Sequence, residues 1–179
     1  MGKIIQMAKA GKISIADLKK SMNKSMGIEA AHDLRQDNPT EVKEWIPTGS
    51  RWLDSIICKG KMAGIPVGKI SEIAGLSSVG KSYLAVQIAA QAQKQGKFVV
   101  YYDAESAIDP KFLTDSGIDM NDNFLYVQAV SVELVLKGIE DMMDQYGHQQ
   151  QFVFIWDSIA ATPSDKDIEG DFNPQSSMA

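Results

Sequence analysis

One stretch of the sequence has the residue types and spacing needed to bind phosphate groups. It reads GLSSVGKS and fits the pattern G-x-x-x-x-G-K-[ST] at every fixed position. Glycines let successive backbone N–H groups point at phosphate oxygens, and a helix that opens at the lysine adds the positive end of its dipole. The lysine would reach the β and γ phosphates, and the last hydroxyl would ligate Mg²⁺. We therefore predict a triphosphate site formed by Gly75, Leu76, Ser77, Ser78, Val79, Gly80, Lys81 and Ser82.

A carboxylate that follows the most apolar run of the chain is a second candidate ligand. Asp157 comes directly after the run FVFIW, which is typical of a buried parallel strand. The carboxyl end of such a strand lies on the ligand-binding edge of its sheet. There Asp157 could hold Mg²⁺ through water, from the side opposite Ser82. The simpler interpretation is that Asp157 caps the next turn, but beside so specific a phosphate motif we favour the magnesium role.

A general base must come from another strand, because Ser158 and not an acid follows Asp157. The run FVVYY ends in Asp103-Ala104-Glu105, directly after the helix expected behind the phosphate motif. A carboxylate there can align a water molecule on the γ phosphate. We favour Glu105 as this base, and Asp103 stays open as the base or as a structural acid at the strand end.

These groups need a framework, and the pattern from Gly68 onward predicts one. Short β-rich runs alternate with longer helical stretches, which indicates βαβ units and a mostly parallel sheet covered on both faces. The fold class is thus α/β. The runs expected to be strands are 69–74, 98–102, 124–128 and 152–156, and the expected helices are 81–95 and 132–146.

An N-terminal arm precedes this core. From Ser14 to Met26 the apolar residues recur in steps of three and four, as on one face of a short amphipathic helix. Ser14 with Asp17 resembles a capping box, and Gly27 is a natural stop. The polar stretch DLRQDNPT then reads as a linker. We therefore expect a helical arm and linker over residues 1–40, and an ATPase-like core over residues 41–179, with the apolar stripe Ile15, Leu18, Met22 and Met26 on the arm.

Composition excludes several classes of protein. The chain has 44% hydrophobic and 23% charged residues and a net charge of -5, as in ordinary globular proteins. No apolar run is long enough for a membrane span, and the N-terminus has no secretion signal, so we expect a cytoplasmic protein without membrane contact. Cys58 is the only cysteine, and His32 and His148 are the only histidines, which argues against disulfides and zinc.

The charge is divided unevenly along the chain. Residues 1–62 hold 11 Lys and Arg against 7 Asp and Glu, whereas residues 63–179 hold 7 against 16. A basic arm on an acidic body suits nucleic acid, or the acidic body of a neighbouring copy. A solvated helix face is the third interpretation, and charge alone does not decide among them.

Four segments together resemble the RecA family of homologous-recombination ATPases, and the likeness runs from about Ser14 to Ala179. The string DAESAIDP is similar to the bacterial and phage branch of that family. Departures in the arm and over residues 52–63 favour a phage-encoded or otherwise divergent member, which would act in the cytoplasm of a bacterial host. The four segments are TGSRWLD (48–54), GLSSVGKS (75–82), YYDAESAIDP (101–110) and WDSIAATPSDKDIEGD (156–171).

The resemblance implies roles for further residues. It makes Glu105 the catalytic base, gives Asp109 a hydrogen bond to adenine, and places Phe112 on the adenine ring, where the family usually has tyrosine. Asp109 is also a good turn start, and Phe112 a good core residue. Glu169 and Gly170 resemble the entrance to the first DNA-binding loop, in which Met178 would lie among the bases. The following FNPQ departs from the family pattern.

The resemblance implies an ATP- and Mg²⁺-dependent recombinase that binds single-stranded DNA as a self-associated filament and pairs it with duplex DNA. Relatives continue past the first DNA loop, and a central strand of their RecA-like sheet comes from that later part. We therefore expect an N-terminal fragment, an interrupted gene or half of a split protein with a separately encoded C-terminal half, inactive as an ATPase by itself. A helicase-like motor and a non-enzymatic subunit that docks on full-length filaments are the alternatives.

Overall fold

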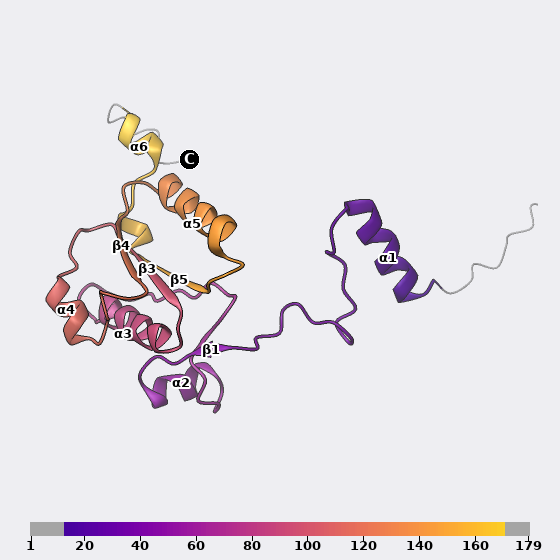
Figure 1. Ribbon diagram of the computed structural model, residues 1–179, viewed down its shortest axis with the longest axis horizontal. Coiled ribbons are helices and arrows are strands. Elements are labelled where there is room, and N and C mark those ends of the chain that lie inside the picture. Colours follow the sequence, from indigo (N-terminus) through magenta and orange to yellow (C-terminus); the bar gives the residue numbers. More distant parts are fainter. Residues whose placement is uncertain (1–12, 171–179) are drawn as a thin grey trace, which may run out of the picture. The chain divides into compact units, whose positions relative to one another are not determined.

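The computed structural model describes residues 13–170 and separates into two compact units, one up to Lys43 and one from Glu44 onward. Figure 1 shows the elements of both units. Each unit is described by itself. No helix among residues 13–170 is both long enough and apolar enough to cross a membrane.

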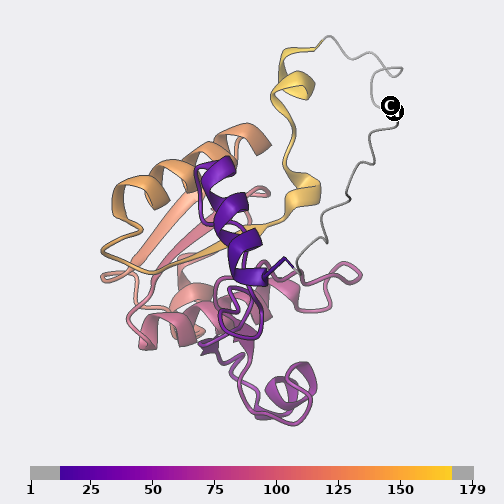
Figure 2. The ribbon, with the colours of Figure 1, turned by 90° about the vertical axis from the view of Figure 1, so that its right-hand side faces the viewer.

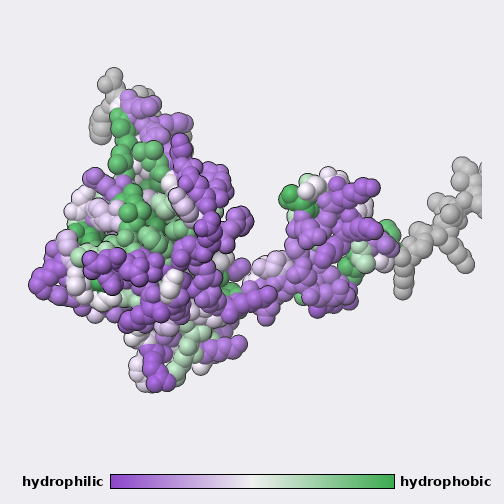
Figure 3. Space-filling model, viewed as in Figure 1, coloured by the Kyte–Doolittle hydropathy of each residue, from purple (hydrophilic) through white to green (hydrophobic). Residues whose placement is uncertain are grey.

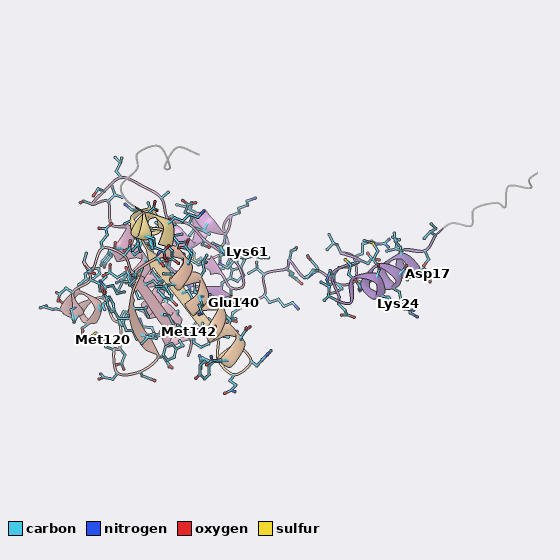
Figure 4. The ribbon with its side chains drawn as sticks, turned by 90° about the horizontal axis from the view of Figure 1, so that it is seen from above. Asp17, Lys24, Lys61, Met120, Glu140 and Met142 are labelled. Atoms are coloured by element: carbon cyan, nitrogen blue, oxygen red, sulfur yellow. The ribbon has the colours of Figure 1, made fainter. Side chains whose placement is uncertain are left out.

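The first unit contains helix α1 (Ile15–Met26), which lies where the sequence predicts it. The Ser14 hydroxyl accepts a hydrogen bond from the Asp17 backbone N–H at 3.1 Å, and Gly27 ends the helix with a left-handed φ of 70°. Asp17 in the first turn and Lys24 in the last complement the helix dipole (Figure 4). None of the residues of α1 is buried in its own unit.

The second unit is built on a three-stranded parallel sheet, as predicted. Strand β3 (Phe98–Asp103) lies in the middle, with β4 (Phe124–Gln128) on one side and β5 (Phe152–Asp157) on the other. Both neighbours run parallel to β3. The register places Asp103 beside Asp157, so that these two carboxylates end adjacent strands at the same edge of the sheet.

Helices cover both faces of this sheet (Figure 2). Val99 and Tyr101 of β3 point to one face, where they join a core formed with helix α3 (Lys81–Lys94). Val100 and Tyr102 point to the other face, beneath helix α5 (Val132–Tyr146). The approach of α5 is close, since a Cβ at Gly138 would come within 2.9 Å of the Tyr102 hydroxyl. The predicted α/β fold with helices on both faces is confirmed.

Several short elements were not predicted from the sequence. An antiparallel pair, β1 with β2, brackets helix α2, and two short helices and a 3-10 turn follow the strands of the main sheet. Their bounds are β1 (Trp45–Ile46), α2 (Arg51–Ile57), β2 (Ile65–Pro66), α4 (Pro110–Asp115), η1 (Ile159–Ala161) and α6 (Asp165–Glu169).

The strand predicted over residues 69–74 is wrong. This segment has no regular structure, and Ile70 is fully exposed. A strand needs a hydrogen-bonding neighbour, and within residues 13–170 the main sheet has the order β4-β3-β5, so β5 pairs with β3 alone. The segment therefore lacks the pairing that would turn it into a strand.

A buried cation connects the start of β3 to the start of the second unit. Lys97 is 1% exposed, and its ammonium donates to the Glu44 carboxylate and, at 2.7 Å, to Gln151 Oε1. Gln151 also donates to Glu44. The hydrogen bond from Lys97 lowers the pKa of the Glu44 carboxyl group below its ordinary value. The Glu44 side chain is 44% exposed, so water can also solvate its carboxylate. The Lys97 ammonium is shielded from water and depends on Glu44 and Gln151 to compensate its charge.

We expect Glu44→Gln to destabilise the protein more than Lys97→Met. The first change leaves a buried cation without its counter-charge, whereas the second leaves a carboxylate that water can reach, and should stay within about 1 kcal/mol of wild type. Urea unfolding at pH 7 measures both, and a lower midpoint for Lys97→Met than for Glu44→Gln would contradict the argument.

Because the pKa of Glu44 is lowered, its stabilising effect is present above the ordinary carboxyl pKa and is lost as the pH falls through the lowered value. The difference between wild type and Glu44→Gln should shrink accordingly on acidification.

Candidate nucleotide-binding site

The phosphate-binding motif forms an exposed loop that leads directly into α3. Residues 75–80 are all exposed, and Gly80 takes the N-cap position with a left-handed φ of 95°. Glycine adopts this conformation without strain, and no side chain caps the helix. The first backbone N–H groups of this 14-residue helix therefore have no side-chain acceptor, and they are the donors that an anion at a helix N-terminus would use.

Lys81 folds back over this loop. Its ammonium donates to the carbonyl oxygens of Gly75 at 3.1 Å and Leu76 at 2.8 Å. It forms no salt bridge with any carboxylate of residues 13–170. The loop thus holds an ammonium group whose only described partners are neutral carbonyls, which leaves its charge available to a phosphate.

Asp157 is held at the end of β5 by a tyrosine that sequence reasoning missed. The buried Tyr101 hydroxyl donates to Asp157 Oδ2 at 2.8 Å. Burial, and then the Asp157 carboxylate, raises the pKa of Tyr101, so it remains a donor. Asp157 does not cap the following turn, since no side chain caps η1. The other carboxylate oxygen of Asp157, Oδ1, accepts no hydrogen bond from the described residues.

Asp103 has a different task, because its carboxylate organises the loop after β3. One oxygen accepts from the backbone N–H of Glu105 at 3.1 Å. The other accepts from the backbone N–H of Ile108 at 3.1 Å and from the Tyr126 hydroxyl at 3.2 Å. Asp103 is 2% exposed, whereas the Glu105 side chain is exposed to solvent. Asp103 therefore fixes the backbone that carries Glu105.

The resemblance places Asp109 and Phe112 at adenine, and in the structure both residues contact other parts of the protein. Asp109 is the N-cap of α4, with its carboxylate accepting from the Lys111 backbone N–H at 3.3 Å. Phe112 is half-buried and lies near Tyr83 of α3, with ring centroids 6.3 Å apart. This contact brings α4 beside the first turn of α3. Tyr83, two residues after Lys81, is 55% exposed and was also missed by sequence reasoning.

The residues expected at a DNA-binding loop lie at the end of the described chain. Glu169 closes α6 and is exposed, and the Gly170 N–H donates to the Lys166 carbonyl at 3.0 Å. The Asp165 backbone N–H donates to Glu133 of α5 at 2.9 Å, which ties the start of α6 to that helix. Met178 lies outside the described residues.

The oxygen groups present suit Mg²⁺ bound together with a nucleotide. Within residues 13–170 no group of three or more His, Cys, Asp or Glu side chains could hold a metal ion alone. Mg²⁺ is usually held by only one or two protein oxygens, together with substrate phosphates and water. Ser82 at the start of α3 and Asp157 at the end of β5 are such oxygen donors, and α3 packs against β5. The residues thus fit a metal that arrives with a triphosphate.

We expect Asp103→Asn to loosen the loop that carries Glu105. An amide has one acceptor oxygen, and its NH₂ group would face a backbone N–H, so at least one charge-assisted hydrogen bond is lost, at a cost of about 1.5–3 kcal/mol. Urea unfolding measures the loss, and amide exchange at Glu105 and Ile108 should become faster. Glu105→Gln, at an exposed position two residues away, is the matched control. Unchanged exchange in Asp103→Asn would show that another contact organises the loop.

Comparison with known proteins shows the family of the chain. The model of the RecA N-terminal domain matches residues 13–179. The RecA protein of Aquifex pyrophilus is 38% identical over 151 residues, which is 84% of this chain and 41% of that protein. The RecA protein of Bifidobacterium breve is 36% identical over 158 residues, or 88% of this chain and 37% of its own length. The chain therefore spans about two-fifths of the length of these relatives. It belongs to the RecA family and corresponds to its N-terminal portion.

Proposed function

We propose that this protein takes part in homologous recombination as an ATP-dependent recombinase that assembles on single-stranded DNA and pairs it with duplex DNA. The observation that carries the proposal is the uncapped N-terminus of α3 behind an exposed loop, with the Lys81 ammonium held over that loop. Free N–H donors, a helix dipole and an available cation together favour a polyphosphate. Membership of the RecA family supports the recombination role.

In this proposal each group of the loop has a defined part. Backbone N–H groups of residues 75–80 and the start of α3 hold the phosphates, and Lys81 binds the β and γ phosphate oxygens in place of the loop carbonyls. Mg²⁺, when bound by Ser82 and through water by Asp157, supplies charge neutralisation at those oxygens. Tyr101 keeps the Asp157 carboxylate in position by donating to Oδ2, which leaves Oδ1 free to face the metal.

Glu105 is the proposed general base. It is exposed at the carboxyl edge of the sheet and therefore able to meet a water molecule, whereas both oxygens of Asp103 already accept hydrogen bonds from the loop. This division of roles favours Glu105 over Asp103, since a base needs a free lone pair directed at the water. Asp109 and Phe112 are proposed to contact adenine, supported by the position of α4 next to α3.

DNA is proposed to bind at the segment that begins with Glu169 and Gly170 and includes Met178. Support comes from the family and from the sequence pattern. The charge of the segment gives no support, because the segment is acidic and DNA is a polyanion. The exposed Glu169 side chain forms no salt bridge with the described residues, and the Gly170 N–H donates to the Lys166 carbonyl. Phosphate contacts would have to come from basic residues elsewhere in the chain.

Self-association is proposed to use α1. Its apolar stripe is half-exposed, with Ile15, Leu18, Met22 and Met26 between 45% and 52% accessible. Residues 63–179 are acidic, whereas the arm is basic, so a second copy offers a surface of opposite charge. One acidic helix there, α5, also exposes apolar residues: Leu134, Leu136, Met143 and Tyr146. A heterologous contact of this type propagates into a filament when the rotation does not close a ring.

We expect Lys81→Ala to weaken binding of ATP and ADP by about 10- to 150-fold. That range is the loss of one charge-assisted hydrogen bond of about 1.5–3 kcal/mol. A fluorescent nucleotide titrated into the 179-residue chain measures it. Glu105→Gln is the matched control and should bind normally. In a chimera that continues into the C-terminal part of the Aquifex pyrophilus protein, Glu105→Gln should slow hydrolysis by about 10²-fold or more. Unchanged affinity of Lys81→Ala would overturn the proposed site.

We expect Leu18→Asp to block self-association and leave the second unit folded. A charge placed in the stripe would have to be buried in an apolar contact without a partner. Light scattering against concentration measures association, and far-UV circular dichroism checks the fold. Ser21→Asp adds the same charge to the same helix beside the stripe and should assemble like wild type. If Leu18→Asp also assembles normally, α1 has no part in the contact.

A further inference from the structure

The surface around α2 combines an exposed tryptophan with positive charges. We define the α2 patch as Arg51, Trp52, Ile56, Lys59, Lys61 and Met62. Trp52 is 85% exposed, Ile56 74% and Met62 60%, and the three basic side chains are exposed as well. In the space-filling view the surface over α2 and the loop after it mixes hydrophobic and hydrophilic residues (Figure 3). Neither the family comparison nor the candidate nucleotide site gives these side chains a role.

The fold of the segment explains why these side chains point outward. Asp54 faces inward, is 5% exposed and accepts from the Thr48 backbone N–H at 2.8 Å, which fixes the roll of α2. Trp52 and Ile56 stand four residues apart and share the opposite, solvent-facing side. After the helix, the Gly60 N–H bonds back to the Ser55 carbonyl at 2.7 Å and turns the chain.

The far end of that turn returns to the helix. The Arg51 guanidinium lies 3.3 and 3.4 Å from Met62 Sδ, so the loop that contains Lys59 and Lys61 folds back beside the first turn of α2. Trp52 follows Arg51 in the same first turn of α2, so its exposed ring belongs to the helical turn beside which the loop folds back. Lys61, labelled in Figure 4, belongs to this loop.

Charge in this region opposes that of the whole protein. From residue 50 to residue 71 every exposed charge is positive, namely Arg51, Lys59, Lys61 and Lys69, and the single carboxylate, Asp54, is buried. None of these cations is paired with a carboxylate among the described residues. In a chain of net charge -5, this local excess of free cations favours a polyanionic partner.

We propose that the α2 patch is a contact surface for single-stranded nucleic acid, separate in sequence from the acidic segment that begins at Glu169. Trp52 offers a ring on which a base stacks, and the surrounding cations bind the phosphates on either side. Tryptophan, methionine and arginine are also frequent at protein interfaces, whereas lysine is depleted there, so Lys59 and Lys61, which are unpaired within residues 13–170, are what favour a polyanion over a protein partner. The inference rests on the proposed DNA-binding function and supplies the basic groups that the segment from Glu169 lacks.

Fluorescence anisotropy of a labelled thymidine oligonucleotide with the 179-residue chain tests the proposal. Trp52→Ala should weaken binding by about 10- to 100-fold, the effect of losing one stacked base, and Trp52→Phe should restore most of it. Lys61→Glu should reduce the slope of log K against log salt by about 0.7 for the lost phosphate contact. Lys94→Glu makes the same charge change on α3 and should leave the slope nearly unchanged.

The possible failures are distinguishable. If wild type binds the oligonucleotide and Trp52→Ala binds equally well, the α2 patch is not a nucleic-acid surface, although the proposed function stands. If Trp52→Ala changes only the association state measured by sedimentation, the patch is a contact between protein copies, and the inference is overturned. If wild type binds no oligonucleotide, the inference and the proposed DNA binding both fail. The proposed nucleotide site is then tested separately by the nucleotide titration of Lys81→Ala.

Discussion

Strand β3 is the element on which the candidate site depends. It is hydrogen-bonded on both sides and buried on both faces, so it has little freedom to shift. Its last residue, Asp103, lies beside Asp157 in register and at the same time fixes the backbone of Glu105. The pairing of β3 with β5 therefore sets the relation between the proposed base and the proposed metal ligand. The backbone register already places Asp103 and Asp157 side by side, so side-chain packing has only to keep these residues in that position.

Local patterns predicted most of this framework. The strands at 98–102, 124–128 and 152–156 and the helices at 14–26, 81–95 and 132–146 carry strong periodicity or β-rich composition, and their own caps or turns end them. Residues 69–74 show the limit of such patterns, because a strand also needs a partner that local sequence does not report. The same limit applies to the bond from Tyr101 to Asp157 and to the buried Lys97, which join residues more than 50 positions apart.

One signal for Tyr101 was nevertheless present in the sequence. Two tyrosines stand directly before Asp103 in an otherwise apolar strand, and a buried hydroxyl usually needs a partner. Alternation along the strand sends them to opposite faces, so only Tyr101 lies on the face that α3 covers. Tyr101 finds Asp157, whereas the Tyr102 hydroxyl beneath α5 has no hydrogen-bond partner among the described residues. The sequence thus predicts that a buried tyrosine forms a hydrogen bond, but it does not identify the acceptor.

The position of Lys81 follows from α3 more than from the loop before it. α3 packs against β3 and β5 through a face that includes Val86, Ala89 and Ala90, all at most 2% exposed. Since the helix is rigid and anchored, its first residue keeps its place although residues 69–74 form no strand. The loop itself is anchored by the bonds from the Lys81 ammonium to the Gly75 and Leu76 carbonyls. In the proposed site, a phosphate that binds the ammonium would take those bonds away, so the proposed nucleotide binding would be coupled to the conformation of the loop through one side chain.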